Sequence, residues 1–134
     1  MKKPTKNMFN VPVVYHIGYQ GRDLAGFLEV LKTNHVDLLV DLREKPFSRV
    51  KGFSKNQLAT SLSVAGIQYL WRGDKLGGFT LGYNDWVKSL PEIADLASTS
   101  TVCIMCMERN PNECHRKQLI RILEDEHDVV GAAL

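Results

Sequence analysis

Short apolar runs rich in β-branched residues alternate along this chain with segments in which apolar residues recur at helical spacing. Strands that alternate with helices pair in parallel, and a parallel sheet needs helices over both of its faces. The alternation therefore predicts an α/β fold with a mostly parallel central sheet of four to five strands. The expected strands are VVYHI (13–17), VDLLVDL (36–42), IQYLW (67–71) and TVCIMC (101–106), with DVVGAAL (128–134) as a possible short edge strand.

Capping residues and helix breakers mark the limits of the expected helices. Asp23 is a candidate N-cap for the first helix, and Ser54 precedes a second helix that Gly66 ends in the C-terminal capping position. A later helical pattern contains Pro91, which predicts a break or a restart of the helix just before it. The last helix is expected over residues 112–127.

The length and composition of the chain limit what it can be. A chain of 134 residues has the usual size of one domain, so we expect a flexible tail at residues 1–10 and a single α/β domain at 11–134. The sequence has neither a signal-peptide pattern nor an apolar run of the ~20 residues that span a bilayer. The three cysteines have irregular spacing, unlike a secreted disulfide framework, and a cytoplasmic location is expected. A net charge of +2 argues against sequence-wide nucleic-acid binding but leaves room for a local phosphate site.

Unusual polar or glycine-rich segments follow each of the first four expected strands. These segments are residues 18–22, 41–49, 76–78 and 106–116. In an open parallel sheet, the carboxyl ends of the strands lie at one edge, and ligands bind there, at a switch in strand order. The four segments should therefore meet at one edge of the sheet and form a site.

Several motifs occur in an order that resembles the DUF488 family of uncharacterised proteins. They are GYQGR, DLREKPFSR, FSKNQLATSLSVAGIQYL, LGG and CMERNPNECHR, and together they cover residues 13–123. The resemblance implies a Rossmann-like, three-layer α/β unit and leaves the reaction open. One departure is the opening Gly18-Tyr19-Gln20, where the family pattern has a histidine after the glycine. The positions that correspond to recurrent family residues are Arg22, Asp41, Arg43, Pro46, Ser48, Arg49, Gly77, Gly78, Cys106, Glu108, Cys114, His115 and Arg116.

The segment after the second expected strand offers groups that could bind an anion. Arg43, Arg49 and the hydroxyl of Ser48 can form a fork for phosphate or carboxylate, because a guanidinium pairs with both in a bidentate way. The alternative is a solvated loop in which Arg43 pairs with Asp41. Asp41 is then either a general base or the anchor of an arginine, and its place at the end of a buried strand allows both.

The segment after the fourth expected strand begins with Cys106. This residue is a candidate nucleophile, with its thiolate favoured by Arg116 and by the N-terminus of the next helix, or else a small buried hydrophobe. If that helix begins at residue 112, residues 114–116 lie in its first turn, where free backbone N–H groups attract anions. A cation there indicates a bound negative partner, unless Glu108 supplies that partner in a salt bridge.

Cys106, Cys114 and His115 raise the question of a metal. The spacing C-x7-C-H lacks a paired C-x2-C and a convincing fourth ligand, so no metal and no other cofactor is predicted. A Cys106–Cys114 disulfide is disfavoured in a reducing cytoplasm, and if one forms it is more readily a redox response than a structural staple. Gly77-Gly78 adds a place where the backbone can come close to a ligand.

Three functions are compatible with these residues. The first is an enzyme that acts on a phosphate-bearing substrate, a nucleotide or a nucleic acid, with Asp41, Cys106 and Glu108 as catalytic candidates. The second is a module that binds a nucleotide, a nucleic acid or an acidic partner without turnover, and the third is a thiol-redox or metal-responsive protein. No interaction with a membrane is expected, and the sequence does not indicate which protein, if any, is a partner. The candidates for binding the ligand are Arg22, Arg43, Ser48, Arg49, Gly77, Gly78, Cys114, His115 and Arg116.

Overall fold

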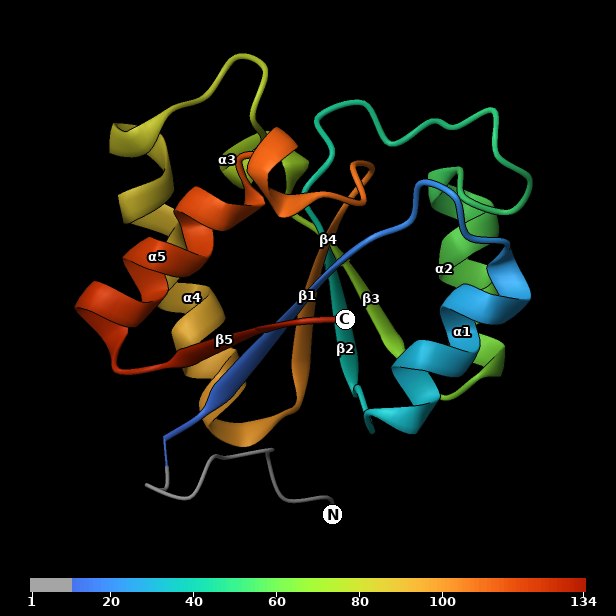
Figure 1. Ribbon diagram of the computed structural model, residues 1–134, viewed down its shortest axis with the longest axis horizontal. Coiled ribbons are helices and arrows are strands. Elements are labelled where there is room, and N and C mark those ends of the chain that lie inside the picture. The colour runs from blue at the N-terminus through green and yellow to red at the C-terminus, as the bar shows by residue number, and fades with distance from the viewer. Residues whose placement is uncertain (1–10) are drawn as a thin grey trace.

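The computed structural model describes residues 11–134 and has a five-stranded, all-parallel sheet at its centre (Figure 1). This confirms the α/β fold with a parallel central sheet, including the edge strand at the end of the chain. The expected tail at residues 1–10 lies outside the described residues. In spatial order the strands are β3 (Gln68–Trp71), β2 (Leu38–Asp41), β4 (Val102–Cys106), β1 (Val13–Gly18) and β5 (Val130–Ala133).

Helices cover both faces of the sheet and complete the three layers (Figure 1). The first and second long helices pack on one face, and the two long helices of the C-terminal half pack on the other. Two short helical segments lie in the connections at the carboxyl ends of the strands. The bounds are α1 (Leu24–Thr33), α2 (Lys55–Val64), α3 (Gly73–Leu76), α4 (Tyr83–Thr99), the 3-10 helix η1 (Pro111–Glu113) and α5 (Arg116–His127).

Local sequence signals account for the ends of α1 and α2. Asp23 Oδ1 accepts a hydrogen bond from the N–H of Gly26 at 2.7 Å, as an N-cap side chain does. Gly66 follows α2 with a φ of +79°, a conformation that is open to glycine at little cost. The predicted N-cap of α1 and the predicted end of α2 are therefore both confirmed.

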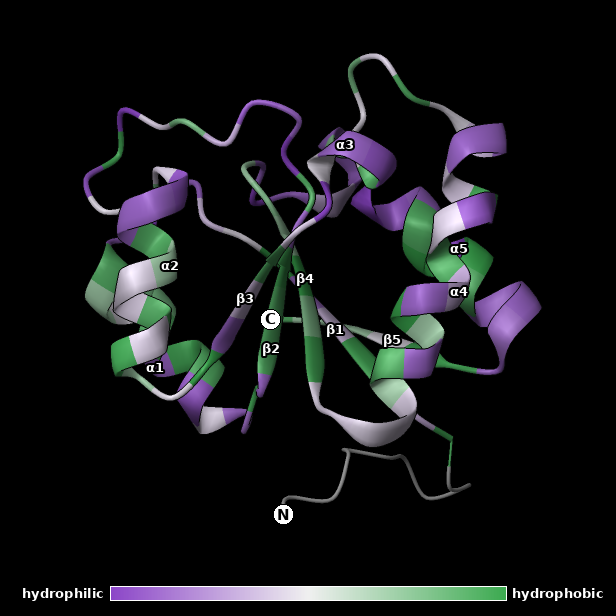
Figure 2. Ribbon diagram, turned by 180° about the vertical axis from the view of Figure 1, so that it is seen from behind, coloured by the Kyte–Doolittle hydropathy of each residue, from purple (hydrophilic) through white to green (hydrophobic). Residues whose placement is uncertain are grey.

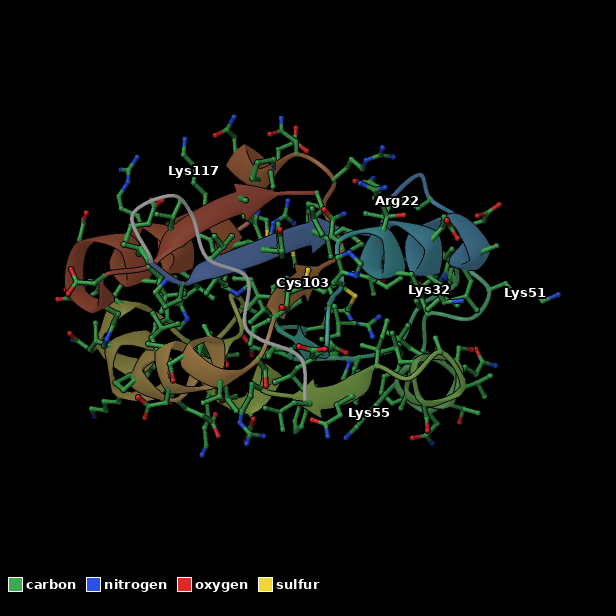
Figure 3. The ribbon with its side chains drawn as sticks, turned by 90° about the horizontal axis from the view of Figure 1, so that it is seen from below. Arg22, Lys32, Lys51, Lys55, Cys103 and Lys117 are labelled. Carbon is green, nitrogen blue, oxygen red and sulfur yellow. A yellow bond between two sulfur atoms is a disulfide. The ribbon has the colours of Figure 1, made fainter. Side chains whose placement is uncertain are left out.

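Two hydrophobic cores lie on the two sides of the sheet. One is formed with α4 and α5 and the other with α1 and α2, and the central strands β2 and β4 are buried along their whole length. Figure 2 shows these two strands as hydrophobic ribbons at the middle of the molecule. Cys103, inside β4, is fully buried in the core that β4 shares with α1 and α2 (Figure 3).

Helix α4 runs through Pro91 without the predicted break. The proline removes one backbone hydrogen bond and crowds the preceding turn, which costs roughly 3 kcal/mol in a helix interior. On the same helix Trp86, Leu90, Ile93 and Ala97 form a buried stripe against the sheet. Burying each large apolar side chain contributes roughly 1.5–3 kcal/mol, so the packing of the stripe outweighs the proline and keeps the helix continuous.

We had expected helix α5 to begin at residue 112, but it begins at Arg116. Residues 111–113 form the separate 3-10 turn η1, and Cys114 follows in an extended conformation with φ −137° and ψ 146°. The Sγ atom of Cys114 accepts a hydrogen bond from the N–H of Arg116 at 3.4 Å. Cys114 and His115 therefore precede the helix. The backbone N–H groups of a first helical turn have no acceptor within the helix, and the Cys114 sulfur serves as the acceptor for one of them.

The strand order places a switch point beside β4. The chain moves from β1 to β2 and β3 through α1 and α2 on one face, and then returns through α4 to insert β4 between β1 and β2. The connections that leave β1 and β4 diverge to opposite faces of the sheet, which opens a crevice at their carboxyl ends. Among the described residues, no helix is both long enough and apolar enough to cross a membrane.

Candidate functional site

A cavity of about 330 Å³ opens at the carboxyl ends of β1, β2 and β4. Its walls come from the connections that follow these strands, together with residues 78–79 and 113–115. The cavity thus lies at the edge of the sheet where the sequence predicted that the four polar or glycine-rich segments meet. Of the candidate site residues, those that line the cavity are Arg43, Gly78, Cys106, Glu108, Cys114 and His115.

The remaining candidate residues do not line the cavity. Arg22 donates hydrogen bonds to the carbonyls of Gly18 and Leu134, at 3.1 and 3.0 Å. Ser48 accepts from the N–H of Val50, and Arg49 is exposed on the same loop. Two further candidates, Asp41 and Arg116, are buried at 0% and 1% exposure, and Gly77 packs against Glu44.

Asp41 and Arg43 form a buried, two-bond ion pair at the end of β2. Arg43 Nε lies 2.9 Å from Asp41 Oδ1, and Arg43 Nη2 lies 2.8 Å from Oδ2. The third guanidinium nitrogen donates to the carbonyl of Phe53 at 2.7 Å. Burial by itself would lower the pKa of Arg43, but the hydrogen bonds and charge of Asp41 together outweigh burial and raise this pKa. The sequence analysis had left this pairing open as part of a solvated loop, and the structure has the pair in the interior instead.

The second carboxylate oxygen of Asp41 also accepts a hydrogen bond from the Tyr69 hydroxyl at 2.6 Å. Burial, and then this contact with Asp41, raise the pKa of Tyr69 far above its ordinary value. Arg43 in turn reaches the hydroxyl of Tyr19, whose ring stacks on Phe53 with centroids 4.5 Å apart. These contacts tie the ends of β1, β2 and β3 together, and they leave Asp41 as an anchor for the cavity wall.

Arg116 spreads its guanidinium beneath the end of β4. Its Nη1 atom lies 2.8 Å from the Sγ of Cys106 and 2.8 Å from the carbonyl oxygen of Glu108. The Nε atom donates to Nδ1 of the buried His16 at 2.9 Å, and Nη2 reaches the carbonyl of Arg109 at 3.3 Å. Burial lowers the pKa of Arg116 from its ordinary value. The N–H groups of this arginine thus donate to acceptors of the protein itself, and one of these acceptors is the Cys106 sulfur.

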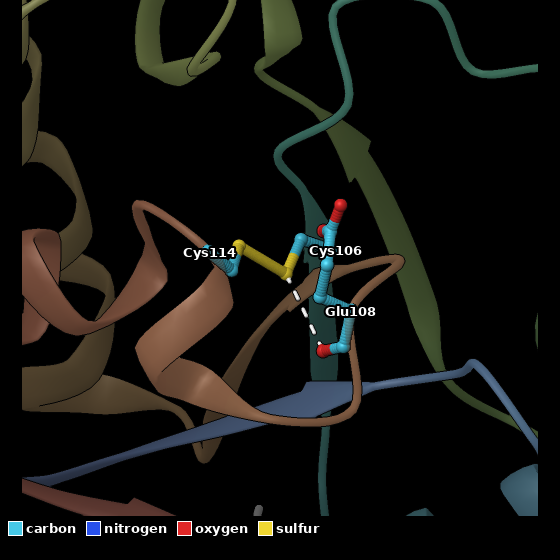
Figure 4. Close-up of side chains that lie close together, drawn as sticks. All are labelled: Cys106, Glu108 and Cys114. Atoms are coloured by element: carbon cyan, nitrogen blue, oxygen red, sulfur yellow. Dashed lines mark hydrogen bonds between the residues drawn. A yellow bond between two sulfur atoms is a disulfide. The ribbon is translucent and has the colours of Figure 1, made fainter.

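Cys106 and Cys114 are joined through their sulfur atoms at the wall of the cavity (Figure 4). The sequence analysis had disfavoured this bond because of the expected compartment. Tertiary structure brings the two residues together, since the extended Cys114 lies between η1 and α5 while Cys106 ends β4. Cys106 is only 3% exposed, and Cys114 is more accessible.

His115 connects Cys114 to the neighbouring loop. Its Nε2 atom lies 2.7 Å from the carbonyl oxygen of Leu76, so Nε2 must carry the proton in that hydrogen bond. In the neutral ring, Nδ1 is then an acceptor, and it lies 3.6 Å from the Sγ of Cys114. Burial, with a smaller contribution from Arg116, lowers the pKa of His115. The imidazole therefore stays neutral near pH 7, with Nδ1 as a hydrogen-bond acceptor beside Cys114.

The profile of a family described as "Domain of unknown function DUF488" matches residues 23–88 and 79–123. The chain belongs to the DUF488 family. The match confirms the resemblance and spans the segments that follow β2, β3 and β4. Neither a curated protein nor a solved structure matches the chain. The chemistry of this DUF488 site must therefore be argued from its geometry.

Sequence reasoning missed Glu44, which organises the cavity wall of this DUF488 protein. Its carboxylate accepts hydrogen bonds from the N–H groups of Phe79 and Thr80, at 2.5 and 2.8 Å, and from the Thr80 hydroxyl. These contacts lower the pKa of Glu44. Gly77 is required beneath it, since a Cβ atom there would overlap the Glu44 side chain. The only signal was the position of Glu44 beside Arg43, which by itself did not predict a partner.

A close approach of backbone to backbone explains a second glycine of the DUF488 pattern. A Cβ atom at Gly18 would overlap the carbonyl group of Glu108, which follows β4. The same carbonyl accepts the hydrogen bond from Arg116. Gly18 therefore allows the β4 connection to fold over the end of β1 and to hold Arg116 against Cys106.

Three side chains of this DUF488 site offer atoms that a metal ion could use. Cys106 Sγ, Cys114 Sγ and a carboxylate oxygen of Glu108 all lie within 4.8 Å of one another. Two thiolates and a carboxylate would suit zinc and leave a fourth position toward the cavity. A sulfur in a disulfide is no longer a thiolate, so metal binding and the Cys106–Cys114 bond exclude each other.

Proposed function

We propose that this chain is a thiol–disulfide oxidoreductase in which Cys106 and Cys114 alternate between dithiol and disulfide. The observation that carries the proposal is the pairing of the two sulfurs at the wall of a cavity, with Arg116 Nη1 at 2.8 Å from Cys106 Sγ. A guanidinium at this distance favours a thiolate over a thiol. Among the three functions compatible with the sequence, thiol redox chemistry has the most support from the geometry.

Cys114 is the attacking thiol in this proposal. It is more exposed than Cys106, it receives a hydrogen bond from the first N–H of α5, and it faces the acceptor nitrogen of His115. Its thiolate attacks one sulfur of a substrate disulfide R–S–S–R′, the substrate bond breaks, and R′–S⁻ leaves. The proton that left Cys114 reaches R′–S⁻ by way of His115, which returns to its neutral form.

Cys106 is the resolving thiol. Its thiolate attacks the Cys114 sulfur of the mixed disulfide, and R–S⁻ leaves with the proton that Cys106 has lost. Over both steps the protein gives up two electrons and two protons, and the substrate disulfide becomes two thiols. In the reverse direction Cys106 is the leaving thiolate when a substrate thiol attacks Cys114, and its contact with Arg116 favours its departure.

A phosphate-bearing substrate, nucleotide or nucleic acid stays a prediction and has less support. The guanidinium of Arg43 is paired with Asp41, and the donors of Arg116 are directed at protein acceptors. The cavity also carries three carboxylates, from Glu44, Glu108 and Glu113, which repel an anion. The cytoplasmic location stays a prediction as well.

The test uses reduced protein and the small neutral disulfide 4,4′-dithiodipyridine. Wild type should release about two equivalents of thiopyridone, one at each step of the exchange. Cys106→Ser should release about one equivalent and keep a trapped mixed disulfide at Cys114, visible in the intact mass. Cys114→Ser should lose the rapid reaction.

Cys103→Ala is the matched control, because Cys103 is buried in the core and does not line the cavity. It should react as wild type does. If Cys114→Ser reacts as fast as wild type, or if Cys106→Ser completes both steps, Cys106 and Cys114 are not a redox pair and the proposal is wrong.

A further inference from the structure

Large apolar side chains are exposed around the mouth of the cavity. Phe47 is 80% exposed, Phe79 is 82% exposed and Met107 is 45% exposed, and all three line the cavity. They come from three separate connections, which follow β2, α3 and β4. We call these three side chains the apolar rim.

The loops that carry the apolar rim are anchored by hydrogen bonds. The N–H of Phe79 donates to the Glu44 carboxylate at 2.5 Å, and the N–H of Phe47 donates to the carbonyl of Lys45 at 2.8 Å. Met107 directly follows Cys106, and its carbonyl accepts from the N–H of Gln20 at 2.8 Å. Exposed apolar side chains that gather around one cavity, on loops held by hydrogen bonds, mark a place where a partner binds.

Charge around the cavity limits the chemistry of that partner. Glu44, Glu108 and Glu113 face the cavity with Lys45 as the opposing charge, while the charge of Arg43 is matched by Asp41 outside the lining. The lining is therefore negative overall, and it stays negative when the charge of Arg116 behind Cys106 is counted. A disulfide that carries carboxylates or phosphates is repelled at close range, and one that carries an ammonium or guanidinium group is attracted.

We propose that the substrate is a polypeptide disulfide whose cysteine is flanked by a large apolar side chain and a basic residue. This inference rests on the proposed thiol–disulfide function. A ligand that touches all three side chains of the apolar rim must extend across the mouth, as an extended peptide does. Its apolar side chain packs against the apolar rim, its basic group meets the carboxylates, and its disulfide reaches Cys114.

The experiment compares the rates at which the reduced protein reacts with synthetic disulfides. Three short, end-blocked peptide disulfides carry Phe-Cys-Lys, Gly-Cys-Lys or Phe-Cys-Glu, and neutral 2-hydroxyethyl disulfide reports the reaction without side-chain recognition. The Phe-Cys-Lys peptide should react fastest. Loss of its phenylalanine should lower the rate about tenfold, the effect of leaving one large apolar side chain unburied. Replacement of lysine by glutamate should lower it further at low salt than at high salt.

Variants of the apolar rim test where this selectivity arises. In the double variant Phe47→Ser with Phe79→Ser, the rate ratio between the Phe-Cys-Lys and Gly-Cys-Lys peptides should fall toward one. Val64→Ser is the control, because Val64 is 87% exposed on α2 and does not line the cavity. Its rates and its rate ratio should equal those of wild type.

The outcomes separate the two proposals. If wild type reacts with 2-hydroxyethyl disulfide but shows no preference among the three peptides, or prefers the acidic peptide, the inference about the substrate is wrong and the redox function stands. If the apolar-rim variant keeps the full preference, the inference is also wrong. If wild type reacts with none of the disulfides, the proposed function itself fails.

Discussion

Arg43 and Arg116 are both buried at the carboxyl edge of the sheet, yet their surroundings differ in one respect. Arg43 is matched by the carboxylate of Asp41 through two hydrogen bonds. Within the described residues, the hydrogen-bond partners of Arg116 are the imidazole of His16, two carbonyl groups and the sulfur of Cys106. The first arginine has its counter-charge, and the second lies against a sulfur that gains a negative charge on deprotonation.

The partners of the two buried arginines explain why Arg43 and Arg116 have different roles. A buried ion pair whose hydrogen bonds are all satisfied has no charge left for a ligand, so Asp41 and Arg43 stabilise the loop that they belong to. A buried cation that lacks a carboxylate partner favours an anion beside it, and Cys106 is in place to supply one. We call the Asp41–Arg43 pair the brace, and Cys106 and Cys114 with their neighbours the cysteine site. Changes in the brace should therefore alter the free energy of unfolding, and changes in the cysteine site should alter thiol reactivity.

The largest expected effect is on the brace. Asp41→Asn removes the counter-charge of Arg43 while it preserves the shape of the side chain, and breaking a buried pair costs about 3–5 kcal/mol. Urea unfolding should show this loss in the free energy of unfolding. The folded fraction should retain thiol reactivity at Cys114. A folded variant with normal stability but no thiol reactivity would reverse the roles that we assign to the two regions.

The next largest effect concerns pH and the cysteine site. Burial, and then the charge of Arg116, lower the pKa of His16 from 6.5 to about 4. The imidazole of His16 therefore binds a proton less readily in the folded protein than in the unfolded chain. Neutral His16 makes its full contribution to the free energy of unfolding above pH 6.5, and this contribution is lost as the pH falls toward about 4. For one histidine it amounts to about 3 kcal/mol.

The variant His16→Asn tests this contribution. Asn Oδ1 can accept the hydrogen bond from Arg116 Nε and does not titrate, so the dependence of the free energy of unfolding on pH should become shallower over this window. His115, whose pKa is also lowered, retains its own contribution of the same sign. An unchanged pH dependence in the variant would mean that His16 is not the buried neutral group beside Arg116.

A smaller effect is expected at the loop that joins the two regions. Glu44 follows Arg43 and accepts hydrogen bonds from the Phe79 and Thr80 N–H groups beside the cysteine site. Glu44→Ala should lower the free energy of unfolding by about 1–2 kcal/mol, because these bonds are exposed to water. Amide hydrogen exchange at Phe79 and Thr80 should become faster. Unchanged exchange there would show that Glu44 does not hold the loop.

The smallest effect is expected for the exposed counterpart of the brace. Arg72 and Glu92 form a two-bond ion pair of similar geometry on the surface, at 2.7 and 2.9 Å. Glu92→Ala should change the free energy of unfolding by only about 0–1 kcal/mol, because water screens the pair. A loss as large as that of Asp41→Asn would mean that burial does not distinguish the two pairs.

Much of the fold followed from local patterns in the sequence. The strands, the cap at Asp23, the glycine at Gly66 and the gathering of polar segments at one edge were all predictable. Predictions that depended on competition between local and distant forces were wrong. Pro91 did not break α4, because the stripe on either side of it packs against the sheet, and α5 began only after the extended Cys114.

The sequence by itself determined which elements form and which loops meet, since hydrophobic periodicity and the polarity of parallel strands are properties of short segments. Only the tertiary structure decided which partners meet within those loops. It joined Cys106 to Cys114, matched Arg43 with Asp41 and placed Arg116 against a sulfur. Such pairings depend on differences of a few ångströms between side chains that are distant along the chain, and no local pattern encodes those differences.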